Sequence, residues 1–549
     1  MGLPKFFSLV IKKFYSSCIT NKQQIRNSHS LCFDLNSVLH TLAGKFFGYT
    51  EDEKERKRII NLLSRNDHKI NWTNYCNLVI AYLKMICNQY LPHTVSINID
   101  GVPPLAKVVQ QRSRRYLVKP YELFDSNSIT PYTDFMNFID DKLSSLIKDI
   151  FADEIIYSGS NIADEGEQKI FSFIRLNVID SKKPILIFGL DADLILMSLL
   201  SNSESIFLIR DVDKGDYTYS VIINIADLKT RINMETGNIN GRFDFCLMVL
   251  LFGSDFYPSV PGITYFDIWE TIFDIYKKEN FNLIKGYEID LRELERFLSS
   301  LPYEGENGLL NFHVKKTHTN DTTSYLASIK YENYRNEYYA FISASSENVF
   351  DMCGNWIEML NWTYSYFKFG SKAVGNKVYY RYPIAPLIPD IISFLRVTNK
   401  IELNIIKEKL NPYAILLDVI PDTSRAVYTN KLDFITDSRK KIIPIIDEYI
   451  PPTKRIIVLP NLEYENNLKK IKRVFENESD ESEESIFKIK EGSVINYSFK
   501  RGLTISRETV RLLSSKKNEK NKIKKEIPIE KVDIFIPKQK TVYVGKLYL

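Results

Sequence analysis

The segment TVSINIDGVPPLAKVVQQRSRRY, residues 94–116, decides the fold. It begins with a short run of apolar and β-branched residues, which is typical of a buried strand. It continues with apolar residues at helical spacing, in a stretch rich in lysine and arginine. Asp100 stands between the two parts, where the strand should end. The segment therefore predicts a strand that leads into a basic helix, with an acidic side chain at the junction.

Other runs have the same apolar character and predict further strands. They are SLCFDL (30–35), EIIYSG (154–159), PILIFGLD (184–191) and SIFLIRD (205–211). Near-continuous apolarity is typical of parallel strands whose two faces are both covered by helices. The segments 52–66 and 132–152 have the periodicity of amphipathic helices. Residues 243–258 predict a buried helix that ends at Gly253. Together these patterns predict an α/β fold with a parallel sheet.

The chain divides into three parts by composition. After about residue 275 the sequence changes to longer helical patterns rich in tyrosine and tryptophan. We expect an α/β region over 1–275, a mostly helical second core region packed on it over 276–475, and a charged tail over 476–549. In the tail, the acidic run ENESDESEES (476–485) predicts disorder, because its carboxylates repel one another. Short apolar segments such as SVINYSF (493–499) could add strands to the sheet or bind a partner protein.

The composition is that of a large globular protein. At 549 residues the chain is too long for one ordinary core, and 44% hydrophobic residues are ample for packed structure. The net charge of +5 is mild, so it does not by itself indicate a nucleic-acid partner. The six cysteines form no C-x-x-C pair, which argues against a zinc site or a disulfide framework. The sequence has no membrane-spanning run and no signal peptide, so we do not expect a membrane-bound or secreted protein. We also expect a monomer, in the cytoplasm rather than the nucleus.

Acidic side chains follow the ends of the expected strands and extend to the loop after Gly253. The seven carboxylates are Asp34, Asp100, Glu165, Glu167, Asp191, Asp193 and Asp255. Any one of them alone is more simply a helix cap or a turn residue. All seven at one edge of a sheet would repel strongly unless divalent cations neutralise them, and oxygen ligands suit Mg²⁺ or Mn²⁺. Two such ions can clamp the attacking and leaving oxygens of a phosphodiester displacement.

The basic helix that follows Asp100 presents a polar face. The residues of this face are Lys107, Gln111, Arg114 and Arg115, spaced i, i+4, i+7 and i+8. Such a row is often only a solvated surface. Here it begins directly after a candidate metal ligand, and arginine matches phosphate oxygens bidentately. We therefore predict a pocket for a terminal phosphate beside the metal site.

The motifs of the chain resemble the XRN family of 5′→3′ exoribonucleases. In the first region they are MGLPKFF, FDLNSVLH, IDGVPPLAKVVQQRSRR, DEGEQKI, GLDADLILMSL and FGSDFYP. In the second region they are WIEMLNWTYSYFKFG, YYRYPIAPLIPDI, NPYAILLDVIPDTS and KRIIVLPNLEYENNLKKI. The resemblance covers roughly residues 1–475 and implies a catalytic domain like those of PIN and flap nucleases, in a compact form of the family.

The resemblance also implies an activity and roles for residues. The family releases nucleoside 5′-monophosphates processively from single-stranded RNA that bears a 5′-monophosphate, which is a reaction of RNA turnover such as mRNA decay. The seven carboxylates would then hold two Mg²⁺ or Mn²⁺ ions. The polar face of the basic helix would hold the 5′-monophosphate, and His40 would contact the first nucleotide.

The chain departs from the family pattern at three positions. Asp164 replaces the glycine that precedes the first glutamate, and Gln168 replaces the histidine that follows the second. Asn376 stands where the family has a tryptophan that stacks on a base. Because such stacking contributes roughly 1–3 kcal/mol per base, its loss would weaken the hold on the RNA end unless another aromatic residue replaces it.

Two other interpretations stay open. The acidic sheet, and the segment GSDFYPSVPGI, are also compatible with a flap-endonuclease-like DNA nuclease. Alternatively, the chain could be a catalytically weak scaffold of XRN type that binds RNA ends or protein partners. The seven retained carboxylates argue against the scaffold, because buried charge without a use is costly.

Overall fold

The structure is a computed structural model, and it describes most of the first 421 residues and short parts of the rest. The described residues are 3, 6–19, 25, 29–48, 52–117, 124–213, 218–260, 269–301, 303–304, 309–310, 334–340, 346–421, 424, 445–446, 457–458, 462–476, 495–498 and 504–505. The acidic run expected to be disordered lies outside them beyond residue 476.

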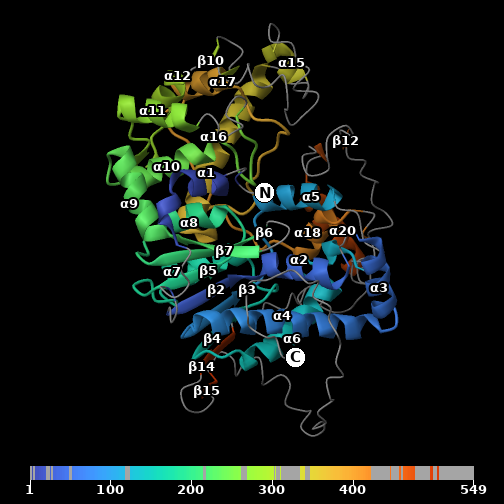
Figure 1. The fold of residues 1–549 in the computed structure, drawn as a ribbon. Coiled ribbons are helices and arrows are strands. Elements are labelled where there is room, and N and C mark those ends of the chain that lie inside the picture. The colour runs from blue at the N-terminus through green and yellow to red at the C-terminus, as the bar shows by residue number, and fades with distance from the viewer. Residues whose placement is uncertain are drawn as a thin grey trace.

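A nine-stranded sheet runs through the described part of the chain, in the order β1-β7-β6-β5-β2-β3-β4-β14-β15 (Figure 1). The strands are β1 (Cys18–Ile19), β2 (Ser30–Asp34), β3 (Thr94–Asn98), β4 (Glu154–Ser158), β5 (Ile185–Phe188), β6 (Ile206–Asp213), β7 (Thr218–Asn224), β14 (Ile495–Ser498) and β15 (Thr504–Ile505). The five from β6 to β4 in this order are parallel. They are the five strands that the apolar runs predict, so the α/β fold with a parallel sheet is confirmed.

Antiparallel strands extend both sides of this parallel core. On one side β7 pairs with β6, and β1 pairs with β7. On the other side β14 pairs with β4, and β15 pairs with β14. The strand β14 lies within SVINYSF, so one of the two alternatives for that segment, an added strand, is what the structure shows.

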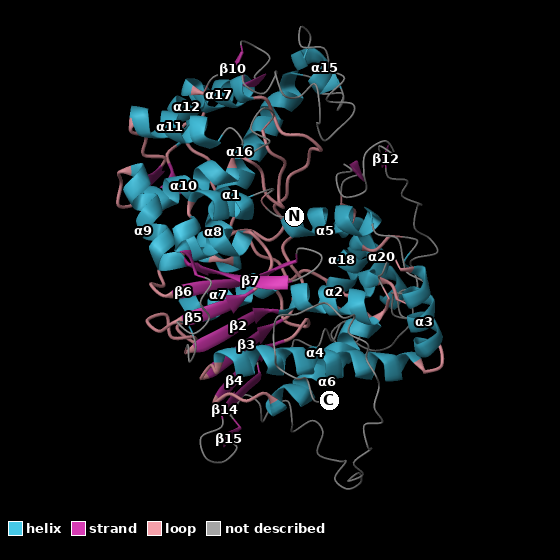
Figure 2. Cartoon of the chain, viewed as in Figure 1, coloured by secondary structure: helices cyan, strands magenta, loops and turns pink. Residues whose placement is uncertain are grey.

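Helices cover both faces of the sheet (Figure 2). Those of the first region are α1 (Phe6–Lys13), α2 (Leu35–Phe46), α3 (Glu53–Leu63), α4 (His68–Tyr90), α5 (Leu105–Leu117), α6 (Asp134–Leu146), α7 (Gly166–Arg175), α8 (Asp193–Leu200), α9 (Ile225–Thr236) and α10 (Gly241–Leu250). Leu31 and Phe33 of β2 pack in a core with α2, α4 and α6. Cys32, whose side chain points to the opposite face, packs in a core with α7, α8, α9 and α10.

Among its described residues the second region is mostly helical, as the sequence predicts, and its first helix spans the expected boundary at residue 275. Its helices are α11 (Trp269–Glu279), α12 (Leu291–Ser300), α15 (Tyr334–Ala340), α16 (Ser346–Phe369), α17 (Ile388–Val397), α18 (Pro412–Val419) and α20 (Tyr464–Glu476). Two-residue strands form hairpins between them, namely β8 (Ile284–Lys285) with β9 (Glu288–Ile289), β10 (Tyr303–Glu304) with β11 (Leu309–Leu310), and β12 (Ile445–Ile446) with β13 (Ile457–Val458). None of the described helices is long and apolar enough to cross a bilayer.

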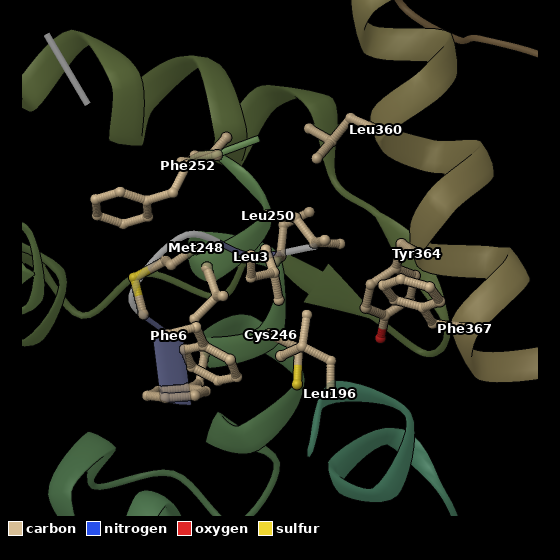
Figure 3. Packing of buried hydrophobic residues seen from close by; sticks show 14 of the residues in the cluster. Leu3, Phe6, Leu196, Cys246, Met248, Leu250, Phe252, Leu360, Tyr364 and Phe367 are labelled. Carbon is tan, nitrogen blue, oxygen red and sulfur yellow. The ribbon is translucent and has the colours of Figure 1, made fainter. Parts of the chain in front are cut away.

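The helix α16 joins the two regions. Its buried aromatic side chains belong to the same hydrophobic core as α8 and α10. Figure 3 shows Tyr364 and Phe367 of α16 beside Leu196 of α8 and Cys246 of α10. On another side of the molecule, α18 and α20 pack against α5 around Leu105 and Val108. The second region is thus packed on the first through the helices that carry the candidate site residues.

Candidate active site

The order of the strands brings the acidic residues to one edge of the sheet. The chain runs outward from β2 to β3 and β4, and then returns to the other side of β2 to form β5. Ligands of open α/β sheets bind at the carboxyl ends of the strands, where the strand order reverses in this way. Asp34 ends β2, Asp100 lies two residues beyond β3, and Asp193 begins the helix after β5.

Two of these carboxylates occupy helix N-cap positions without acting as caps. Asp34 precedes α2 and Glu165 precedes α7, yet neither side chain accepts a hydrogen bond from its helix. By contrast, Asp52 and Asp290 cap α3 and α12 through such bonds. The capping explanation therefore fails for Asp34 and Glu165, and their side chains remain available to the site.

The first turn of α7 lies directly against two of the strand-end carboxylates. The N–H of Gly166 donates to Asp100 Oδ1 at 2.7 Å. A Cβ atom on Gly166 would lie 2.7 Å from Asp34 Oδ1 and 3.4 Å from Asp100 Oδ1. Only glycine leaves room for this approach, which brings the ends of β2, β3 and α7 together.

The carboxylates are close enough to perturb one another. Burial, followed by repulsion from Asp100 and other carboxylates, raises the pKa of Asp34 well above its usual range. Burial and repulsion from Asp255 raise the pKa of Asp193 to about 8. Burial and repulsion from Glu165 raise the pKa of Glu167 well above its usual range.

The remaining members of the set belong to the same network. Burial raises the pKa values of Asp100 and Glu165, and Asp191, although exposed, repels both Asp34 and Asp100. The structure thus places all seven predicted carboxylates in one electrostatic cluster.

Lys107 of α5 enters this cluster. Its Nζ lies 2.7 Å from Glu165 Oε1 and 2.8 Å from Asp255 Oδ2. Burial alone would lower the pKa of Lys107, but attraction to Asp255 and Glu165 outweighs it and raises the pKa well above its usual range. Arg114 reaches the same Asp255 oxygen at 3.5 Å. The basic face of α5 and the acidic strand ends therefore meet directly.

The other residues of the basic face lie nearby. Gln111 is buried, and the Nε and Nη2 atoms of Arg115 donate to Thr130 Oγ1 at 3.0 and 2.9 Å. His40 of α2 is exposed at the surface. Partial burial of its ring, followed by repulsion from Arg115 and Arg114, lowers the pKa of His40.

The donor set fits a hard divalent cation. It consists of oxygen atoms only, the type that Mg²⁺ and Mn²⁺ prefer. Glu167 Oε2 and Asp193 Oδ1 are buried and have no hydrogen-bond partner among the described residues. Such atoms are costly unless a cation or a donor reaches them. As the side chains stand, no three acidic, histidine or cysteine residues in the described part of the chain form a group compact enough for a metal ion.

The three departures from the family pattern have distinct surroundings. Asp164 has a positive φ of 86°, and its Oδ2 accepts a hydrogen bond from Ser371 Oγ at 2.6 Å. Gln168 Nε2 donates to the carbonyl of Tyr366 at 3.2 Å. The side-chain amide of Asn376 exchanges two hydrogen bonds with the backbone of Glu408. That amide therefore links two segments of the chain, and it offers no aromatic ring on which a base could stack.

Sequence reasoning missed two buried residues that hold the site. Lys169 Nζ donates to the carbonyls of Ile99 and Gly159, at 2.5 and 2.8 Å, and so fixes the chain just before Asp100. The hydroxyl of Tyr366 donates to Glu165 Oε2 at 2.9 Å. The lysine inside the acidic motif DEGEQKI was a usable signal for the first residue. The second lies 201 residues from its partner, so no local pattern could indicate it.

The first part of the chain matches a known protein family. Residues 1–122 and 118–212 match the family model described as the XRN 5′-3′ exonuclease N-terminus. The solved structures include the catalytic core of Rad2 in complex with a DNA substrate, which is 12% identical and has a TM-score of 0.28. That match covers 51% of this chain and 75% of the Rad2 chain.

Curated relatives are similar over about half of this chain or somewhat more. The 5′-3′ exoribonuclease 1 of Schizosaccharomyces pombe is 28% identical, over 51% of this chain and 24% of its own length. The human protein of that name is 27% identical, over 48% of this chain and 18% of its own length. A putative 5′-3′ exonuclease of Acanthamoeba polyphaga mimivirus is 22% identical, over 62% of this chain and 50% of its own length. The chain therefore spans a quarter or less of these two eukaryotic proteins and half of the viral one. Residues 1–212 are therefore similar to the N-terminal part of the XRN family of 5′-3′ exonucleases.

Proposed function

We propose that the protein is a metal-dependent, processive 5′→3′ exoribonuclease that degrades 5′-monophosphorylated single-stranded RNA to nucleoside 5′-monophosphates. The observation that carries the proposal is the contact of Lys107 with both Glu165 and Asp255. Through it, the helix face suited to a phosphate meets the carboxylates suited to divalent cations. The similarity to the 5′-3′ exoribonuclease 1 of Schizosaccharomyces pombe and of human supports the same activity.

Each group has a part in the proposed reaction. The seven carboxylates would hold two Mg²⁺ or Mn²⁺ ions, which when bound activate a water and stabilise the developing phosphate charge. Lys107, Gln111, Arg114 and Arg115 supply the donors that grip the terminal phosphate. The lysine and the two arginines hold a terminal phosphate, whose charge is near −2, more strongly than an internal diester. The pocket therefore selects an RNA end.

The test is RNA degradation with three kinds of 5′ end. The purified protein is incubated with Mg²⁺ and RNAs that are identical except for a 5′-monophosphate, a 5′-hydroxyl or a 5′-triphosphate. A branched DNA flap is assayed in parallel. We expect mononucleotides only from the monophosphate substrate. Equal degradation of all three would contradict the phosphate pocket, and preferred cleavage of branched DNA flaps would contradict the choice of RNA.

A variant with two substitutions serves as the control for the metal site. Asp191→Asn together with Asp193→Asn should abolish nucleotide release, because both carboxylates belong to the proposed metal site. RNA binding, measured by fluorescence anisotropy, should persist because the basic face of α5 is unchanged. Retained activity in this variant would show that the acidic cluster is not the catalytic centre.

A further inference from the structure

The C-terminal end of α16 reaches the acidic cluster from the second region. There the hydroxyl of Tyr366 donates to Glu165 Oε2 at 2.9 Å, and both side chains are buried. The other oxygen of Glu165 pairs with Lys107 at 2.7 Å. Each oxygen of this carboxylate thus has a fixed donor, one from α16 and one from α5. Glu165 cannot rotate without breaking one of these contacts.

The end of α16 and the turn that follows it hold the segment on either side of Glu165. Ser371 Oγ donates to Asp164 Oδ2 at 2.6 Å, one residue before Glu165. Gln168 Nε2 donates to the carbonyl of Tyr366 at 3.2 Å, three residues after it. The loop that carries Glu165 is therefore held at three points by one short stretch of the second region.

A further contact fixes the other helix that bears a carboxylate. Lys368 Nζ donates to the carbonyl of Leu200 at 2.6 Å, at the end of α8. The same helix begins at Asp193. An ammonium group at a helix C-terminus also interacts favourably with the helix dipole. Thus α16 contacts both α7 and α8. Three of the seven carboxylates belong to these helices: Glu165 at the N-cap of α7, Glu167 within α7 and Asp193 at the start of α8.

We propose that Tyr366 is a positioning residue for the metal site, whose hydroxyl fixes the Glu165 carboxylate in the orientation that a divalent cation requires. The second region then completes the metal site and does not merely cover it. This inference rests on the proposed function for the reaction that the metal serves, but metal binding itself can be tested without RNA.

The surroundings of Tyr366 allow a clean substitution. Its ring stacks on Trp362 with 4.7 Å between centroids, and Phe256 contacts it edge-on at 5.6 Å. Tyr366→Phe keeps this packing and removes only the donor to Glu165. Tyr364 on the same helix gives a matched control, because it is equally buried and its hydroxyl has no partner among the described residues. Figure 3 shows Tyr364 beside Phe367, among the buried hydrophobic residues.

The experiment measures Mn²⁺ binding and RNA turnover on the full chain. Each variant is first shown to be folded by a cooperative unfolding transition in urea with EDTA present. Its Mn²⁺ affinity is then measured by isothermal titration calorimetry. We expect Tyr366→Phe to weaken Mn²⁺ binding about 10- to 100-fold, the usual effect of losing a group that orients a metal ligand. In RNA turnover kcat should fall by a similar factor while KM changes little, because the substitution leaves in place the four residues proposed to grip the terminal phosphate. Tyr364→Phe should behave as the wild type.

A second pair of variants tests the route of the effect. If Tyr366 acts through Glu165, Tyr366→Phe should weaken Mn²⁺ binding much less in a Glu165→Gln background than in the wild type. An equal loss in both backgrounds would overturn the proposal.

The outcomes separate this proposal from the proposed function. Unchanged Mn²⁺ affinity in Tyr366→Phe would overturn it whatever the RNA result, and so would an equal loss in Tyr364→Phe or a wild type that binds no Mn²⁺. If the wild type degrades no RNA but Tyr366→Phe selectively loses Mn²⁺ affinity, the proposed function fails and the positioning role of Tyr366 stands.

Discussion

Lys107 and Glu165 form an ion pair with 2.7 Å between Nζ and Oε1, and their side chains are only 8% and 4% exposed. A buried pair of this kind is weak evidence of net stability, because both ions have lost their hydration. Removing one partner is a different matter, since the other then stays buried without a countercharge. Substitution of Lys107 should therefore lower the stability of the folded protein even without substrate.

We expect Lys107→Met to lower the free energy of unfolding by about 3–5 kcal/mol in EDTA, because Glu165 and Asp255 lose their countercharge. Urea denaturation measures this difference. Lys57→Met is the matched control, because Lys57 pairs with Glu53 on the surface, where both side chains are about two-thirds exposed. That exposed pair should contribute about 1 kcal/mol or less. Equal losses in the two variants would show that the acidic cluster does not depend on Lys107.

The pH dependence of stability should reveal the buried carboxylates. The pKa of Asp193 is about 8 in the folded protein, against about 4 in an unfolded chain. Between these values the folded state binds more protons, so Asp193 makes the free energy of unfolding fall as pH rises. Relative to the wild type, Asp193→Asn should therefore gain thermal stability steadily from pH 5 to pH 8 in EDTA.

Comparison with a variant is needed because other groups titrate with the opposite sign. Burial lowers the pKa values of Lys169 and Lys229 to about 8 and about 7, so these lysines make stability rise with pH above those values. The difference in melting temperature between the wild type and Asp193→Asn removes their contribution. A difference that stays constant over this range would mean that Asp193 is ionised throughout it.

The orientation of Arg115 should depend on Thr130. Both Nε and Nη2 of Arg115 donate to Thr130 Oγ1, which holds the guanidinium plane. We expect Thr130→Val to reduce the preference for 5′-monophosphate over 5′-hydroxyl RNA by about tenfold, because a hydrogen bond to a charged group contributes about 1.5–3 kcal/mol. Competition between the two RNAs measures this preference. Thr73→Val on the exposed side of α4 is the control, and an unchanged preference in Thr130→Val would contradict the role of Arg115.

Asp164 combines backbone strain with a useful contact. Its φ of 86° lies in the left-handed region, which costs roughly 1–2 kcal/mol for a residue with a Cβ atom, but its carboxylate accepts a hydrogen bond from Ser371. Asp164→Gly loses the hydrogen bond and relieves the strain, whereas Asp164→Ala loses the bond and keeps the strain. The glycine variant should be the more stable of the two by about 1 kcal/mol in urea denaturation. Equal stability would show that the backbone there is not strained.

Local patterns predict the core of the fold and the acidic half of the site. All five apolar runs form the parallel strands, because a strand buried on both faces must be apolar along its length. The carboxylates follow from the same pattern, since the ends of parallel strands meet at one edge. The roles of His40 and of the basic face stay predictions, because no ligand contact tests them.

Contacts between distant segments were beyond the sequence. The position of Lys107 on the helix face suggested a phosphate ligand, but not its two ion pairs with Glu165 and Asp255. Nothing near Tyr366 indicated that its hydroxyl would reach the site. Asn376 could be identified as a departure from the family, but not as a link to the backbone of Glu408. Each of these contacts joins residues more than 30 positions apart in the sequence, and the contact of Tyr366 with Glu165 also depends on how the second region packs on the first.

The pairing of β14 with β4 has a consequence for handling the protein. Residues 495–498 cover the outer edge of β4, in register from Ile495 opposite Tyr157 to Ser498 opposite Glu154. Without them, the backbone N–H and C=O groups along that edge would face solvent as a template for another chain. A shortened chain that ends near residue 475, where the sequence predicts that the second region ends, would therefore be prone to self-association and aggregation even with the acidic cluster intact.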